Sequence, residues 1–131
     1  METISVRTNS RNSFTEITHE VASVISSEGW QDGIVVIYTP HTTSAVTINE
    51  NADPDVQADM NSFLSKLIPN LSEFRHYEGN SDSHIKSSLV GCSETVIVEN
   101  GQMVLGTWQG IYFCEFDGPR TRKVHIKFLQ G

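Results

Sequence analysis

The sequence contains few of the features that mark secreted, membrane or redox proteins. Only two cysteines, Cys92 and Cys114, occur in 131 residues, and two are too few for a disulfide framework. They are not spaced as a Cys-x-x-Cys pair, which excludes a zinc ribbon or a thioredoxin-like motif. No apolar run approaches the roughly 18 residues that a membrane helix needs. The first residues lack the basic and apolar blocks of an export signal, so we expect a cytoplasmic chain with free thiols.

Basic residues are also scarce. The chain has 9 Lys and Arg against 16 Asp and Glu, which gives a formal charge of -7. Nucleic acid is therefore not an expected partner, because its binding depends on Lys and Arg neutralising phosphates. The basic residues do cluster near the C-terminus, at Arg120, Arg122, Lys123 and Lys127. This cluster leaves room for a local site that binds a small anion.

The length and composition predict one globular domain over residues 1–131. Apolar residues make up 37% and charged residues 19%, as in soluble globular proteins. Neither an internal repeat nor a linker rich in Pro, Gly or Ser divides the chain.

Short β-branched runs predict several strands joined by turns. The run at 34–38 reads as a strand buried on both faces, and Pro40 ends it. Asn100-Gly101 is the strongest two-residue hairpin signal, between runs at 95–98 and 103–105. Further strands are expected at 45–48, at 111–114 and at 123–128, with one or two between residues 5 and 18. The fold class that follows is α+β, a mainly antiparallel β sandwich with two or three packed helices.

The two or three expected helices have local end signals. The clearest begins at Asp53-Pro54, with Asp53 as N-cap and Pro54 at the first helical position, and ends before Pro69. Another has Thr18 as its cap and stops near Gly29. A short third helix is expected over 84–89.

Histidines supply the first candidate chemistry. His41 lies in a turn dense in hydroxyls, and His76 and His84 bracket a polar stretch that contains Glu78 and Asn80. Such nitrogen and oxygen groups can converge on a metal ion or a phosphate. Their spacing matches no named zinc signature, and solvated loop residues that cap helices remain the alternative interpretation.

Two further polar segments are candidates for the same site. Glu50 lies one short strand from His41, so a carboxylate and an imidazole can share a cleft. Trp108 and Gln109, between two glycines, can stack on and hydrogen-bond a heteroaromatic ring; a strand corner with Trp108 in the core is the alternative. The cations suited to phosphate contacts are Lys86, Arg120 and Arg122.

Four of these segments together resemble the YjbQ family, also called UPF0047 or the secondary thiamine-phosphate synthase family. The resemblance runs from about residue 10 to the C-terminus. The segments that carry it are His41-Thr42-Thr43-Ser44-Ala45-Val46-Thr47-Ile48-Asn49-Glu50-Asn51-Ala52-Asp53-Pro54-Asp55-Val56, His76 with Glu78-Gly79, Ser83-His84-Ile85-Lys86-Ser87-Ser88-Leu89-Val90-Gly91 and Leu105-Gly106-Thr107-Trp108-Gln109-Gly110-Ile111.

This resemblance implies a compact α+β homotrimer with a polar cleft near its subunit contacts. It also implies a transferase of thiamine biosynthesis that joins hydroxymethylpyrimidine diphosphate to thiazole phosphate and releases pyrophosphate. Many relatives carry a longer Asp-, Asn-, Gly- and His-rich insertion before the second histidine motif. Here that stretch is short, so either Asn80 or Asp82 is expected to take its acidic or amide role.

The expected site follows from these segments. Catalytic roles are expected for His41, Glu50, His76 and His84. Substrate contacts are expected from Asn80, Lys86, Trp108, Gln109, Arg120 and Arg122. A divalent cation, Mg²⁺ or Zn²⁺, is expected on His41, His76 and His84, although histidine ligands suit a transition metal better than Mg²⁺. A trimeric module that binds a phosphorylated metabolite without turnover, and a metal-dependent hydrolase, remain alternative functions.

Overall fold

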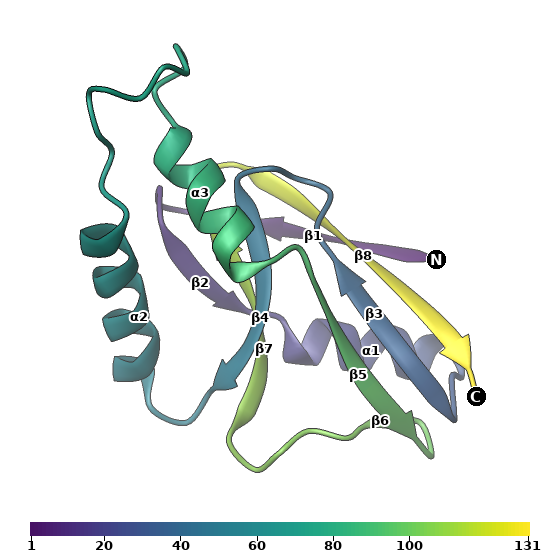
Figure 1. Ribbon diagram of the computed structural model, residues 1–131. Helices are drawn as coiled ribbons and strands as arrows, with labels where there is room; N and C mark the ends of the chain where they lie inside the picture. The colour runs from purple at the N-terminus through teal and green to yellow at the C-terminus, as the bar shows by residue number, and fades with distance from the viewer.

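The computed structural model describes all 131 residues, which form eight strands and three helices (Figure 1). In chain order the elements are β1 (Glu2–Arg7), β2 (Ser13–Glu16), α1 (Thr18–Glu28), β3 (Gly33–Tyr38), β4 (Ser44–Glu50), α2 (Pro54–Leu67), α3 (Ser81–Val90), β5 (Ser93–Glu99), β6 (Gln102–Met103), β7 (Gln109–Glu115) and β8 (Thr121–Gln130). No helix is both long and apolar enough to cross a bilayer.

The strands form two sheets in which every pair is antiparallel. One sheet has five strands in the order β1-β8-β3-β5-β6, and the other has three in the order β2-β7-β4. This arrangement confirms the predicted α+β class with mainly antiparallel strands.

The main core lies where both sheets and α1 meet. Val35 and Ile126 from the five-stranded sheet, Phe113 from the three-stranded sheet and Ile25 from α1 belong to one buried cluster. Each is at most 1% exposed, so this cluster is the principal source of hydrophobic stabilisation.

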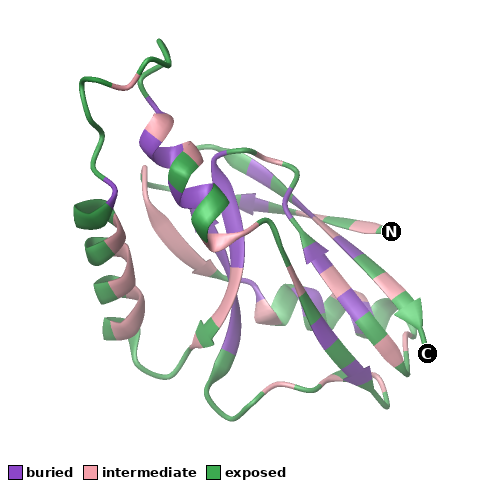
Figure 2. Cartoon of the chain, viewed as in Figure 1, coloured by how far each residue is buried: buried purple, intermediate pink, exposed green.

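Helices α2 and α3 cover the other face of the three-stranded sheet. A smaller cluster of Ala45, Cys114 and Phe116 contacts Leu64 of α2 and Val90 of α3. Burial raises the pKa of the Cys114 thiol, which keeps this sulfur in its protonated form. Helix α2 has no fully buried residue, and Figure 2 shows it as the most exposed of the covering elements.

The outer face of the five-stranded sheet has no layer over it. Ile34 is 36% exposed and Tyr38 is 42% exposed, whereas Val35 and Ile37 between them are buried. The prediction that β3 is buried on both faces is therefore wrong. A continuous β-branched run does not distinguish a central strand from one whose outward side chains stay open.

The helix boundaries agree with the predictions in part. Asp53 caps α2, because its side chain accepts a hydrogen bond from the Asp55 N–H at 2.9 Å. Thr18 does not cap α1: Ile17 holds that position, and the Thr18 hydroxyl instead accepts from the Ile111 N–H at 2.8 Å. Helix α3 begins at Ser81, earlier than predicted.

The Asn100-Gly101 hairpin is confirmed. It joins β5 and β6, and both residues have positive φ, 53° at Asn100 and 76° at Gly101. Asparagine and glycine tolerate this backbone region better than other residues, which is why the pair specifies the turn.

Replacing Phe113 with alanine tests the position of the core. Phe113 is fully buried between the sheets, so Phe113→Ala should lower the free energy of unfolding by about 3–5 kcal/mol through the cavity it leaves. Phe63→Ala, on the exposed side of α2, should cost less than about 1 kcal/mol and serves as the control. Urea denaturation measures both, and equal losses would contradict the assigned core.

Candidate functional site

A cavity of about 450 Å³ brings together the three histidines that the sequence singles out. No hydrophobic residue lines it. Its lining consists of Pro40, His41, Thr42, Thr43, His76, Glu78, Asn80, His84, Asp117, Arg120 and Arg122. We call it the histidine cavity.

Three separate parts of the chain build the histidine cavity. The β3–β4 loop supplies His41, and the segment before α3 supplies His76. Helix α3 supplies His84, while the β7–β8 turn and the start of β8 supply Arg120 and Arg122. Figure 1 shows these parts at one end of the molecule, where α3 approaches the start of β8.

The His41 ring extends the hydrogen bonding of the sheet. Strand β3 ends at Tyr38, which pairs with His125, and His41 Nε2 then accepts the backbone N–H of Lys123 at 2.9 Å. This bond requires an unprotonated Nε2. Burial, and then the charge of Arg122, lower the pKa of His41, so the neutral ring with its proton on Nδ1 is favoured at neutral pH.

His76 and His84 also line the cavity, with their rings edge to face. Their ring centroids are 5.4 Å apart and the rings are nearly perpendicular, at 88°. His76 Nε2 lies 3.8 Å from a Glu78 carboxylate oxygen. The pair therefore offers imidazole groups that can donate to or accept from a bound ligand.

Asp117 links helix α3 to the arginine side of the cavity. Its carboxylate accepts from Asn80 Nδ2 at 2.8 Å and from the Arg120 guanidinium at 3.2 Å. The Asn80 residue is 9% exposed, and its Oδ1 is buried without a hydrogen-bond partner. A ligand or water that donates an N–H or O–H would satisfy this oxygen.

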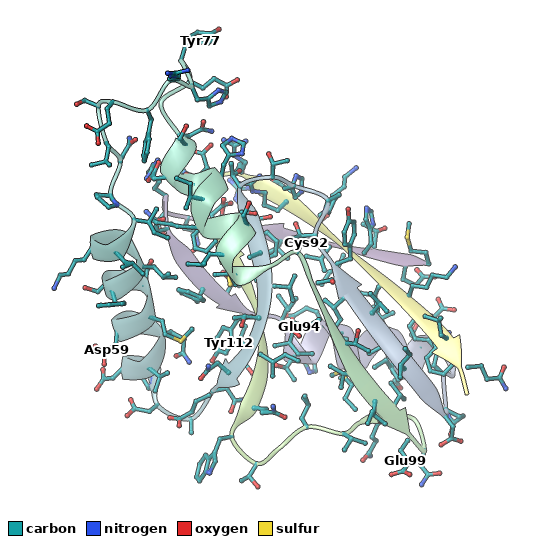
Figure 3. The ribbon with its side chains drawn as sticks, in the orientation of Figure 1. Asp59, Tyr77, Cys92, Glu94, Glu99 and Tyr112 are labelled. Atoms are coloured by element: carbon teal, nitrogen blue, oxygen red, sulfur yellow. The ribbon has the colours of Figure 1, made fainter.

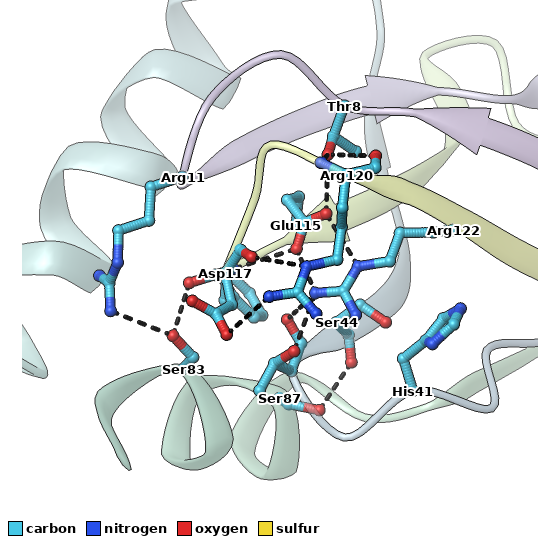
Figure 4. A network of polar contacts seen from close by, with 12 residues as sticks. Thr8, Arg11, His41, Ser44, Ser83, Ser87, Glu115, Asp117, Arg120 and Arg122 are labelled. Carbon is cyan, nitrogen blue, oxygen red and sulfur yellow. Dashed lines mark hydrogen bonds and ion pairs between the residues drawn. The ribbon is translucent and has the colours of Figure 1, made fainter. Parts of the chain in front are cut away.

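A buried ion pair forms the base of the site (Figure 4). Arg122 donates to Glu115 through Nε at 2.9 Å and to Thr43 Oγ1 at 2.8 Å. Glu115 also accepts from the Thr8 hydroxyl and from the Asp117 N–H. Burial acts to raise the pKa of Glu115, but these hydrogen bonds outweigh it and hold the pKa below its ordinary value. The pair is therefore charged and hydrogen-bonded at neutral pH.

Hydroxyl groups fix α3 against the three-stranded sheet. Ser83 donates to the Phe116 carbonyl and Ser87 to the Ser44 carbonyl, each at 2.6 Å. Asp82 is 1% exposed and forms an ion pair with Arg11 at 2.9 Å (Figure 4 shows Arg11 beside α3). Of the two alternatives left open by the sequence, Asn80 lines the cavity and Asp82 does not.

Several backbone N–H groups near this end of the molecule have no acceptor within the protein. The amides of Thr42 and Thr43 in the loop, and of Ser81 and Asp82 at the start of α3, donate to no protein acceptor. The first N–H groups of a helix carry partial positive charge and favour anions. Of these residues Thr42 and Thr43 line the histidine cavity, and their amides together with Arg120 supply donors for an anionic ligand there.

The histidines as arranged do not fit the expected divalent cation, Mg²⁺ or Zn²⁺. No group of three or more His, Cys, Asp and Glu side chains is placed so that it could hold a metal ion. The Nε2 of His41 is already engaged with Lys123, which leaves only Nδ1 of that ring.

The expectation that Glu50 shares a cleft with His41 does not hold. Glu50 ends the seven-residue strand β4, whose first residue lies beside the cavity. At about 3.3 Å per residue the two ends of this strand are roughly 20 Å apart. The Glu50 carbonyl, at that far end, accepts from Gln57 and from Tyr112.

Trp108 and Gln109 lie at the same far end, because β7 runs antiparallel to β4. Trp108 is 62% exposed, so it neither lines the histidine cavity nor enters the core. The Gln109 side chain closes its own turn by accepting from the Gly106 N–H at 2.7 Å. Trp108 and Gln109 therefore lie too far from the histidines to bind a ring in the same site.

Lys86 is turned away from the cavity. It is 2% exposed, and its ammonium donates to Asn12 Oδ1 at 3.1 Å. Burial lowers its pKa. A side chain so enclosed supports α3 and is not available for the phosphate contact expected of it.

Two residues of the site were missed at the level of sequence, Asp117 and Glu115. Asp117 reads as an ordinary turn residue before Gly118. Glu115 had a detectable signal, since a carboxylate at the end of the apolar run 111–114 needs a buried cation on a neighbouring strand.

Comparison with known proteins places the chain in a family. Residues 2–131 match the family described as UPF0047 protein YjbQ-like. The chain belongs to the YjbQ family. A UPF0047 protein of Methanocaldococcus jannaschii is 56% identical over 124 residues, which cover 95% of this chain and 90% of that protein. UPF0047 protein YugU of Bacillus subtilis is 52% identical, with 98% of each chain covered.

Two solved structures share the whole fold. An uncharacterised YjbQ/UPF0047 protein of Clostridium acetobutylicum aligns with a TM-score of 0.95 at 49% identity, covering 98% of this chain and 100% of that one. A hypothetical protein of Aeropyrum pernix aligns with a TM-score of 0.93 at 36% identity, covering 100% of both chains. The arrangement of sheets and helices described above is thus that of the YjbQ family.

The buried ion pair should be essential for stability at this end. Arg122→Met leaves the Glu115 charge buried and unpaired, so it should lower the free energy of unfolding by about 3–5 kcal/mol. The double variant Arg122→Met/Glu115→Leu removes both charges and should recover most of that loss. Because the folded pKa of Glu115 is lowered, its contribution is present above the unfolded pKa and disappears as pH falls through the folded value.

Urea denaturation at pH 7 and across the acid range below about pH 5 measures both effects. The double variant should lose less stability on acidification than the wild type. A single variant as stable as the wild type would contradict the assigned role of the pair.

Proposed function

We propose that the histidine cavity binds the phosphate end of a phosphorylated small molecule. The observation that carries this proposal is the convergence of Arg120, the start of α3 and the β3–β4 loop on one polar cavity. The Arg120 side chain is half exposed, and its Nε and one Nη donate to Asp117, which leaves the other Nη for a ligand. Arginine binds phosphate oxygens in pairs, and free backbone N–H groups supply further donors.

We further propose that the reaction is thiamine-phosphate synthesis, the activity that the family resemblance implies. In this reaction the ring nitrogen of thiazole phosphate attacks the methylene carbon of hydroxymethylpyrimidine diphosphate. The carbon–oxygen bond to the diphosphate breaks, and its electron pair leaves with pyrophosphate. Groups that favour negative charge on the leaving diphosphate lower this barrier. Arg120 and the imidazoles of His76 and His84 can take that role, and in this proposal the chain works in the cytoplasm.

A direct test uses purified protein and the two thiamine precursors. Thiamine phosphate should form with the wild type and be lost or strongly reduced in His84→Ala. Arg120→Ala should weaken the binding of inorganic pyrophosphate by about tenfold, as expected for the loss of a charged hydrogen-bond donor. Lys66→Ala, which removes one positive charge from the exposed end of α2, should leave binding unchanged.

Titration calorimetry with pyrophosphate and chromatography of the products give the two readouts. Pyrophosphate binding without turnover would favour the non-catalytic module. Absence of binding in the wild type would contradict the proposal, and hydrolysis of a phosphorylated substrate alone would favour the hydrolase.

We also propose that the chain forms a homotrimer, as the family resemblance implies, through the outer face of the five-stranded sheet. Ile34 is the register partner of both Ile97 and Leu129, and all three side chains are exposed there. They line a hollow of about 490 Å³ on that uncovered face. Exposed apolar patches of this kind favour contact with another chain.

Ile97→Glu should disrupt such an assembly. The variant introduces a charge into the apolar face and should yield monomers, whereas the wild type should have three times the 14.6 kDa chain mass. Leu67→Glu is the control, since Leu67 is similarly exposed but lies on α2. Light scattering after size-exclusion chromatography decides, and a wild-type monomer at micromolar concentration would refute the trimer.

A further inference from the structure

The histidine cavity continues into a second hollow. This hollow has a volume of about 550 Å³ and lies between α3 and the β3–β4 loop. It shares Pro40, His41, Thr42 and His84 with the histidine cavity. The two hollows therefore form one groove whose halves meet at His41 and His84.

The second hollow differs in chemistry from the first. Beyond the four shared residues it is lined by Tyr38, Thr39, Ser87, Ser88, Gly91 and Cys92, and we call it the Tyr38–Cys92 hollow. None of these side chains is an arginine, lysine or carboxylate, whereas the histidine cavity contains Arg120, Arg122 and Asp117. A ligand with a charged end and a neutral end would be oriented by this difference.

The Tyr38 ring forms one wall of the Tyr38–Cys92 hollow, and the ring of His125 packs against it. Tyr38 is 42% exposed and stacks on His125, with ring centroids 6.3 Å apart and an angle of 18° between the rings. Cys92 lies beside Tyr38, since its carbonyl accepts the Thr39 N–H at 2.9 Å, and Ser88 on α3 also lines the hollow. Neither the Ser88 hydroxyl nor the Cys92 thiol forms a hydrogen bond within the protein. Figure 3 shows Cys92 in the segment that leaves α3 for β5.

We infer that the Tyr38–Cys92 hollow binds the uncharged heteroaromatic ring of the substrate whose diphosphate occupies the histidine cavity. This inference rests on the proposed function and extends it by assigning the ring a place. Each hollow has the volume of an ordinary small-molecule site. The hollow offers a flat ring for stacking and free hydroxyl and thiol groups for the ring's polar atoms.

The assignment also places His41 and His84 at the junction of the two halves. In the proposed reaction, the bond between the methylene carbon and the diphosphate lies at that junction. Trp108 and Gln109, the ring contacts expected from sequence, are at the other end of β7 and take no part in this binding mode.

Filling the hollow with a large side chain tests the inference. Ser88 is exposed on α3, so Ser88→Trp should fold while its indole occupies the Tyr38–Cys92 hollow. The variant should bind hydroxymethylpyrimidine diphosphate at least about tenfold more weakly than the wild type, which is the effect expected from losing one stacked ring. Its affinity for inorganic pyrophosphate should stay within about twofold of the wild type. Leu89→Trp, one residue further along α3 and outside this hollow, should change neither affinity.

Equal binding of hydroxymethylpyrimidine diphosphate by Ser88→Trp and wild type would overturn the inference while leaving the proposed function intact. Failure of wild-type protein to bind pyrophosphate would instead overturn the proposed function.

A second readout uses only the wild-type protein. Cys114 is buried, so alkylation of the native chain reports on Cys92. Hydroxymethylpyrimidine diphosphate should slow that alkylation at least about tenfold and pyrophosphate should not; equal rates with both ligands would overturn the inference.

Discussion

The site depends on one buried interaction, the ion pair between Arg122 and Glu115. Two opposite charges at most 3% exposed on their side chains are stable only if each is paired and hydrogen-bonded. Thr8, Thr43 and the Asp117 amide meet that requirement, and they come from different segments of the chain. The pair therefore ties the β1–β2 connection, the β3–β4 loop and the β7–β8 turn to one point beneath the cavity (Figure 4).

Helix α3 is positioned by a second set of polar contacts. Ser83 and Ser87 bond to carbonyls of the chain beneath the helix, and Asp82 pairs with Arg11, so the side chains on that face of the helix are fixed. His84 and Asn80 are then left facing the β3–β4 loop. Because the two serine contacts are buried, the groove between the loop and α3 is preorganised for a ligand rather than formed on binding.

Much of the fold was predictable, because strands, turns and caps are local properties. Asp53-Pro54 and Asn100-Gly101 were correctly placed, since a cap and a turn need only adjacent residues. The exposure of Ile34 was not predictable, because it depends on what covers the sheet.

The same limit applies to the site. His41 and His84 belong to different segments that meet only through sheet register and packing. The resemblance to a family pointed to both residues, but the sequence could not show that they lie in one cavity. The expectation that Glu50 lies beside His41 was wrong for a geometric reason. An extended strand separates the two residues, so residues close in the sequence lie far apart in space.

The central claim is that the histidine cavity, and not the Trp108 end of the molecule, binds phosphate. NMR mapping of backbone amides during titration with inorganic pyrophosphate tests it most directly. The account predicts saturable shifts at the free amides of Thr42 and Thr43, which line the cavity, with no change at Trp108 and Gly110. Shifts confined to the Trp108 end, or none at all, would contradict it.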